Sequence, residues 1–225
     1  MTPVFVNVFN RLTTTRTLCD QIAKLNDALP VIIDNASDYE PLLDWYDNCE
    51  FEVLRLRENL GHHAPWISGI LSYDREPFYV VTDCDLDLTG VPLDVLNYLR
   101  QPLIRDNQLT KVGLSLEIND LPTWQSEVIS WELKFWKRKH RLHTAFFDAW
   151  CDTTFAIYRR DTPHRQAMGV RWALRADRPY TARHVPWYLD CDNLDEENQQ
   201  YFATASAANT WKPNGMKLSS RFSKA

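Results

Sequence analysis

The sequence lacks the features that would assign it at once to membrane, secreted or nucleic-acid-binding proteins. It has no run of 18 or more apolar residues, the length that a membrane-spanning helix needs. Its first ten residues are apolar but carry no basic segment and no small-residue cleavage site, so we expect no signal peptide. A net charge of −5 also argues against a nucleic-acid partner held by bulk positive charge.

Cysteine is sparse and scattered. The five cysteines are odd in number and contain no C-x-x-C pair, which excludes a disulfide framework and a zinc knuckle as the basis of the fold. This use of cysteine is typical of the reducing cytoplasm, where we expect the protein to act. Internal repeats and linkers rich in Gly, Pro or Ser are also missing, so we interpret residues 1–225 as a single domain.

The chain does have enough apolar residues for a sizeable core, since hydrophobic residues make up 44% and charged residues 24% of it. Four short runs in the first half combine β-branched and aromatic residues, as strands buried on both faces do. These predicted strands are residues 4–9, 30–33, 51–56 and 78–81.

The segments between these runs have helical signals. Apolar residues between 18 and 29 are spaced four, three and four apart, which is the pattern of one helix face. Ser37 and Glu40 form an S-x-x-E capping box for a second helix, and Pro65 suits the first turn of a third helix over 62–72. Strand and helix thus alternate, which predicts an α/β fold with a parallel, doubly wound sheet.

The second half is less regular. We expect two more strands at 111–118 and 153–158, a helix between them over 124–139, and a last helix over 193–208. The basic run near the end of the helix at 124–139 suits the negative end of a helix dipole.

Four successive predicted strands end in polar side chains, and ligands of open parallel sheets bind beyond the carboxyl ends of the strands. In chain order these residues are Asn10 and Arg11, then Asp34, Asn35 and Ser37, then Arg57, Asn59, His62 and His63, then Asp83, Asp85 and Asp87. A turn or helix cap explains any single one as well as a ligand does, and the His pair favours a helix start over phosphate binding. The four ends together favour a binding site.

Three aspartates in five positions, Asp83, Asp85 and Asp87, form the strongest of these signals. Charges this close repel one another unless a cation neutralises them, and oxygen ligands suit Mg²⁺ or Mn²⁺. An EF-hand is excluded because its sixth position needs Gly where this chain has Leu88. Two motifs remain: the D-x-D-x-T of haloacid-dehalogenase-type phosphatases at 85–89, which normally follows the first strand, and the D-x-D of glycosyltransferases at 83–85.

In the order and spacing of these motifs, the chain resembles a small GT-A fold glycosyltransferase, similar to family-two enzymes of bacterial or viral type. The matching segments lie within about the first 120 residues: 6–11, 32–37, 57–61 and the D-x-D at 83–85. The resemblance implies a single GT-A domain with a Rossmann-like, mostly parallel sheet. It further implies a nucleotide-sugar-binding half at 1–118 and an acceptor-binding half at 119–225.

The resemblance also implies roles for individual residues. The nucleotide would be held by the first three strand ends and the first Asp of the D-x-D, namely Phe9, Asn10, Arg11, Asp34, Asn35, Arg57, Asn59, His62, His63 and Asp83. Asp83, Asp85 and the late His184 would ligate a Mn²⁺ or Mg²⁺ that bridges the diphosphate. The usual acidic pair that supplies the base is not visible, so Asp120 and Asp152 are the candidates for it. A helix cap for Asp120 and a turn for Asp152 are equally simple roles.

We therefore expect a metal-dependent glycosyltransferase that moves a hexose from a UDP-sugar to a hydroxyl acceptor, such as a glycan or a lipid-linked glycan. The alternative enzyme is a Mg²⁺-dependent phosphatase of the haloacid-dehalogenase type, with Asp85 as nucleophile and Asp87 as acid and base. A carbohydrate-binding module would account for the nine tryptophans but not for the acidic cluster.

Overall fold

The structure is a computed structural model that describes residues 1–72, 76–167, 169, 172–205, 211–212 and 217–218. Its centre is an eight-stranded sheet in the order β3-β2-β1-β4-β9-β6-β10-β8. The first four strands all run parallel: β1 (Thr2–Val8), β2 (Ala28–Asp34), β3 (Glu52–Arg55) and β4 (Phe78–Asp83). They overlap the four predicted strands, and the doubly wound α/β prediction is confirmed.

The second half of the sheet contains strands of both directions. β9 (Ala156–Arg159) runs antiparallel to both of its neighbours, β4 and β6 (Lys111–Gly113). β10 (Ala173–Ala176) is parallel to β6, and β8 (Phe146–Asp148) closes the edge in the antiparallel sense. The sheet is therefore mostly parallel, with β9 and β8 reversed.

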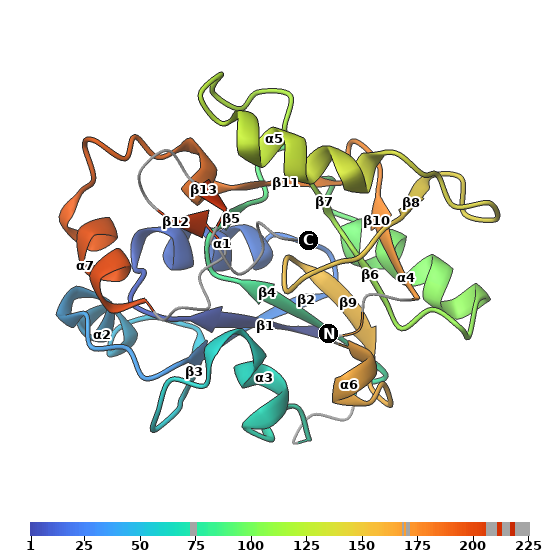
Figure 1. Ribbon diagram of the computed structural model, residues 1–225. Helices are drawn as coiled ribbons and strands as arrows, with labels where there is room; N and C mark the ends of the chain where they lie inside the picture. The colour runs from blue at the N-terminus through green and yellow to red at the C-terminus, as the bar shows by residue number, and fades with distance from the viewer. Residues whose placement is uncertain (73–75, 168, 170–171, 206–210, 213–216, 219–225) are drawn as a thin grey trace.

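Helices cover both faces of this sheet, α3 and α6 below it and α1 and α5 above it in the view of Figure 1. One core lies between the sheet and α1, α2 and α4, and a smaller core packs Phe5 and Tyr79 against Trp66 of α3. The helices are α1 (Thr13–Ile22), α2 (Glu40–Tyr46), α3 (Ala64–Ile67), α4 (Val95–Arg105), α5 (Ser126–Glu132), α6 (His164–Ala167) and α7 (Glu196–Thr204). Short 3₁₀ turns are η1 (Gly61–His63), η2 (Ile70–Ser72), η3 (Leu133–Trp136) and η4 (Val185–Tyr188). Among the described residues, no helix is long and apolar enough to cross a bilayer.

Several predicted elements are shorter, for local reasons. α1 ends at Ile22 because the chain turns at Asp27, whose φ is +63°, and Leu29 already lies in β2. The predicted helix over 62–72 breaks at Gly69, whose φ of +78° suits glycine. The predicted capping box of α2 is wrong, since the Ser37 hydroxyl accepts a hydrogen bond from the Asn10 N–H.

The predicted strand over 111–118 is divided between two sheets. β6 stays in the main sheet, whereas β7 (Ser115–Leu116) joins β5 (Leu86–Asp87) and β11 (Thr181–His184) in a small sheet ordered β5-β11-β7. A further pair is β12 (Trp211–Lys212) with β13 (Lys217–Leu218). The small sheet brings residue 184 back to the end of β4, about 100 residues earlier in the chain.

Two predicted helices of the second half are present in the structure, and one further helix was not predicted. α5 and η3 together cover most of 124–139, and α7 lies within 193–208, of which 206–208 are outside the described residues. α4 is not among the predicted helices. Its buried Val95, Leu99 and Leu103 have helical spacing, but the sequence between them contains Pro102, which usually ends a helix.

Candidate functional site

Asn10 connects the loops that follow β1 and β2. It has a φ of +49° and is fully buried. Its Nδ2 donates to Asp38 Oδ1 at 2.6 Å, while its Oδ1 accepts from the backbone N–H groups of Asp38 at 2.8 Å and Tyr39 at 3.1 Å. The side chain therefore binds the start of α2, and its role is to hold the loop geometry.

Asp34 and Asn35 are also buried and bonded within the protein. The Asp34 carboxylate accepts from the Tyr46 hydroxyl at 3.3 Å and lies 3.7 Å from Arg55 Nε. Asn35 donates to the Gly61 carbonyl at 3.0 Å and accepts from the Leu60 N–H at 2.7 Å. These contacts join the end of β2 to the loop after β3, so both residues shape the expected nucleotide side.

The remaining residues expected on the nucleotide side are more open. Arg57, Asn59 and His62 are exposed, and Phe9 and His63 are half-buried. Asn59 accepts from the Gly61 N–H at 2.9 Å, which fixes the turn before η1. Burial and the neighbouring imidazoles of His62 and His164 lower the pKa of His63.

Arg11 is buried between α7 and the D-x-D. Its side chain is 2% exposed, and its NH1 donates to Asn198 Oδ1 at 2.9 Å. The guanidinium carbon lies 3.7 Å from the centre of the Tyr201 ring, and Nε lies 3.8 Å from Asp85 Oδ2. Burial is the largest single influence and opposes the charge, but Asp85 together with Tyr201 and Cys84 outweighs it, so the pKa of Arg11 is raised. Within the chain, Arg11 thus contacts α7 and the D-x-D.

Asp85 and His184 meet at the end of β4. β11 pairs antiparallel with β5, which places His184 opposite Leu86, and the Val185 N–H donates to the Asp85 carbonyl at 2.9 Å. His184 Nε2 lies 3.6 Å from Asp85 Oδ1, too far for a hydrogen bond. Both Asp85 Oδ1 and His184 Nδ1 are buried and without a hydrogen-bond partner.

The charge states of these two groups suit a cation. Burial is the main cause that lowers the pKa of His184, so the imidazole is neutral at pH 7. A neutral imidazole nitrogen and a carboxylate oxygen are both ligands of Mn²⁺. An unpartnered buried carboxylate oxygen costs free energy, and a bound cation would supply its missing partner.

Asp83 lies on the other side of the D-x-D and faces Thr153. The Thr153 hydroxyl lies 2.8 and 2.9 Å from the two carboxylate oxygens, and the Asp83 N–H donates to the Thr153 carbonyl at 2.9 Å. Burial, Asp85 and Asp152 raise the pKa of Asp83 well above its usual value. Asp152 is therefore close enough to interact with Asp83.

The expected set of three metal ligands is not assembled within the chain. Among the described residues, no group of three His, Cys, Asp or Glu side chains lies close enough to hold an ion. Asp85 and His184 provide two donors, and Asp83 turns toward Thr153. An ion at this place would need further ligands from a bound molecule.

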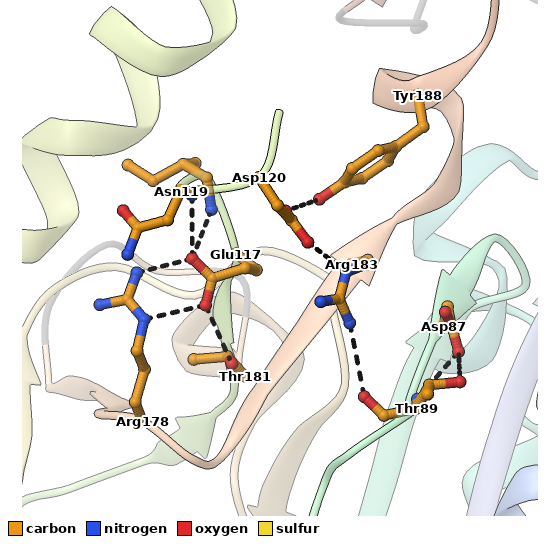
Figure 2. Close-up of polar contacts among 10 residues, drawn as sticks. Asp87, Thr89, Glu117, Asn119, Asp120, Arg178, Thr181, Arg183 and Tyr188 are labelled. Atoms are coloured by element: carbon orange, nitrogen blue, oxygen red, sulfur yellow. Dashed lines mark hydrogen bonds and ion pairs between the residues drawn. The ribbon is translucent and has the colours of Figure 1, made fainter. Parts of the chain in front are cut away.

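Asp120 belongs to a different network of polar contacts, which Figure 2 shows. Its two oxygens accept from Arg183 Nε and the Tyr188 hydroxyl, each at 2.7 Å. These hydrogen bonds outweigh partial burial and lower the pKa of Asp120. A carboxylate held in this way is a weak base.

Glu117 and Asp87 are likewise satisfied by the protein (Figure 2). Arg178 donates to both oxygens of Glu117, at 2.6 and 2.9 Å, and these bonds together with backbone N–H groups lower the pKa of Glu117 to about 2 despite burial. Asp87 accepts from Gln21 Nε2 at 2.7 Å and from Thr89. Arg183 also donates to the Thr89 carbonyl at 3.5 Å, which ties β11 to the turn after β5.

Three residues that contact Asp83 or Arg11 are not among those predicted from the sequence, namely Thr153, Asn198 and Tyr201. No local motif marks them. Thr153 lies 70 residues from Asp83, and Asn198 lies 187 residues from Arg11, so only the assembled fold brings them together.

The similarity of this chain to known proteins lies in its structure. No protein-family model matches the chain, and no curated protein matches it. The mannosyltransferase PcManGT from Pyrobaculum calidifontis, solved with GDP-Man and Mn²⁺, is similar with a TM-score of 0.52 and 14% identity, over 82% of this chain and 56% of that chain. TarS of S. aureus, residues 1–349, is similar with a TM-score of 0.50 and 14% identity, over 81% and 60%.

These likenesses show the fold. The protein is an α/β chain of the GT-A type, as the resemblance of its motifs implied. It spans less than two thirds of the length of either neighbour.

Proposed function

We propose that the protein is a metal-dependent glycosyltransferase that moves a hexose from a nucleoside diphosphate sugar, UDP-linked, to a hydroxyl acceptor. The observation that carries this proposal is the pair of donor atoms at the end of β4. Asp85 Oδ1 and His184 Nε2 lie 3.6 Å apart, and Asp85 Oδ1 is buried without a partner. They stand at the carboxyl end of a parallel strand, where ligands of open sheets bind.

Asp85 and His184 would hold the cation, Mn²⁺ or Mg²⁺, and the donor diphosphate would complete its ligand set. When bound, the cation stabilises the negative charge that gathers on the departing diphosphate. The similar mannosyltransferase was solved with GDP-Man and Mn²⁺, which supports the same type of donor and metal here.

The donor nucleotide would lie over the ends of β1 to β4, in the half formed by residues 1–118. Asp34, Asn35 and Asn10 order this surface through buried hydrogen bonds. Arg57, Asn59 and His62 are exposed on this surface, and we propose that they contact the nucleotide. The base and sugar specificity is set by these loops, and UDP is the donor nucleotide that we propose.

Asp152 is our candidate for the base that takes the proton of the acceptor hydroxyl. It is near enough to Asp83 to raise the pKa of that residue, and it belongs to the half at 119–225 that we assign to the acceptor. Asp120 is the weaker candidate because Arg183 and Tyr188 occupy its oxygens. We propose a glycan or lipid-linked glycan as acceptor and, from five cysteines that are all free thiols, the cytoplasm as the location.

The phosphatase alternative is less well supported. It needs Asp87 as a free acid and base beside Asp85, whereas Asp87 is bonded to Gln21 and Thr89. Its motif also follows the fourth strand of the sheet rather than the first.

A donor-hydrolysis assay tests the proposal. The purified protein is incubated with UDP-hexoses and GDP-mannose, in Mn²⁺ and in EDTA, and nucleotide release is measured with the Asp85→Asn variant as control. We expect Mn²⁺-dependent release of UDP that the variant lacks. Release of phosphate from a simple monoester, with no nucleotide released from any donor, would favour the phosphatase instead.

A further inference from the structure

The C-terminal helix α7 is fastened to the loop that follows β1. Glu197 accepts hydrogen bonds from the Thr13 N–H, at 3.1 and 3.2 Å, and from the Thr13 hydroxyl, at 2.8 Å, and so caps the N-terminus of α1. Asn10 Nδ2 donates to Thr204 Oγ1 at 3.1 Å. Figure 1 shows α7 beside α2 at the tip of β1. Segments 184 residues apart thus form one unit.

Arg11 joins this unit to the proposed metal ligand. Its guanidinium is held on one side by the Tyr201 ring at 3.7 Å and by Asn198 at 2.9 Å, and its Nε points to Asp85 at 3.8 Å. Nε is buried and has no hydrogen-bond partner, so the Asp85 carboxylate is its counter-charge. A planar guanidinium packed on a ring has a fixed direction, which a flexible ammonium would not have.

We propose that Arg11 is a positioning residue for Asp85, and that α7, through Tyr201 and Asn198, thereby sets the affinity of the site for its divalent cation. The inference rests on the proposed function for the identity of the ligand. Asp85 lies between Arg11 at 3.8 Å and His184 at 3.6 Å, so its orientation depends on both neighbours. Residues that orient a metal ligand from behind typically contribute about 10- to 100-fold to metal affinity.

The coupling runs in both directions. If α7 holds Arg11 against Asp85, the charge of Asp85 must in turn stabilise α7, because linkage between two sites is reciprocal. The stability of α7 in the metal-free protein therefore reports the same interaction without any ligand.

The first test measures Mn²⁺ affinity by electron paramagnetic resonance of free Mn²⁺, at saturating UDP. Tyr201→Leu removes the ring under Arg11, and Tyr201→Phe keeps it. Glu196→Gln, on the exposed face of α7, is the matched control. We expect a loss of roughly tenfold or more in Tyr201→Leu and in Asn198→Ala, a smaller loss in Tyr201→Phe, which gives up only the hydrogen bond between the Tyr201 hydroxyl and Arg11, and less than about twofold in Glu196→Gln. Circular dichroism checks folding.

The second test is hydrogen exchange of the α7 amides in the metal-free protein. Asp85→Asn and Asp87→Asn remove one charge each from neighbouring positions, but only Asp85 is paired with Arg11 in the structure. We expect exchange over 196–204 to accelerate in Asp85→Asn, by roughly threefold or more, and to stay at the parent rate in Asp87→Asn.

The results of the two tests distinguish failure of the coupling between α7 and Asp85 from failure of the proposed function. Unchanged α7 exchange in Asp85→Asn, or unchanged Mn²⁺ affinity in a folded Tyr201→Leu variant, would overturn the coupling. A parent protein that binds no Mn²⁺ with UDP, together with faster exchange in Asp85→Asn, would refute the proposed function and leave the positioning of Asp85 by Arg11 intact.

Discussion

Two groups of acidic side chains near the small β5-β11-β7 sheet differ in how the chain satisfies them. Asp87, Glu117 and Asp120 each receive hydrogen bonds from the chain itself, and the pKa of each is lowered. Asp83 has its pKa raised by burial and by neighbouring carboxylates, and Asp85 keeps one oxygen without a partner. The first three carboxylates hold the surrounding loops together, whereas the open oxygen of Asp85 is the feature on which the proposed cation site rests.

The largest expected effect is the loss of metal affinity when the Asp85 carboxylate is removed. Asp85→Asn should lower Mn²⁺ affinity in the presence of UDP by roughly 100-fold or more, because it removes one of the two donors that the chain offers. Electron paramagnetic resonance of free Mn²⁺ measures it. An Asp85→Asn variant with parental Mn²⁺ affinity would remove Asp85 from the metal site.

Asp83→Asn should raise the stability of the fold at neutral pH. A raised pKa means that the ionised form is disfavoured in the folded protein, so stability falls as the pH rises above the usual Asp value of 3.8. The amide removes that cost, and we expect an increase in Tm of roughly 2 to 6 °C at pH 7, vanishing below about pH 4. Calorimetric scans at both pH values measure this change in Tm. A lower Tm of the variant at pH 7 would contradict the view that the ionised form of Asp83 is disfavoured in the folded protein.

The sequence predicts an element or a contact when the residues that determine it are close together in the chain. β1 to β4 are short apolar runs with polar ends, so neighbouring residues suffice to predict the parallel half and the D-x-D position. The roles of Asp120 and Arg11 were not predictable, because their partners lie 63 and 187 residues away in the chain. Whether a polar residue binds a ligand or only another part of the protein depends on residues that are far away in the chain. Hydrophobic periodicity gives no information about those residues.

Glu117 is one of the carboxylates that accept hydrogen bonds from the chain. Its folded pKa of about 2 lies below the usual 4.5, so its ionised form stabilises the fold above pH 4.5, and this stabilisation is lost as the pH falls toward 2. Glu117→Gln should cost about 1 kcal/mol at pH 7, after allowance for partial exposure and solvent screening. Urea unfolding should show this loss at pH 7 with unchanged UDP affinity. A large loss of UDP affinity would place Glu117 in the site instead.

Asp87→Asn should have the smallest effect on catalysis. As a scaffold residue bonded to Gln21 and Thr89, its amide variant should keep donor hydrolysis within about tenfold of the parent. A general acid in a phosphatase would instead lose roughly 10²- to 10⁴-fold. Rates at saturating Mn²⁺ distinguish the two, and a loss of that larger size with intact metal binding would revive the phosphatase alternative.

The most direct measurement of the central claim is calorimetric titration of UDP into the protein, once with Mn²⁺ and once with EDTA. If Asp85 and His184 hold a cation that also binds the donor diphosphate, chelation of that cation removes the positive charge that attracts the diphosphate. We predict UDP binding that is at least roughly tenfold tighter with Mn²⁺, with the difference abolished in Asp85→Asn. Equal UDP affinity in Mn²⁺ and EDTA would contradict the account.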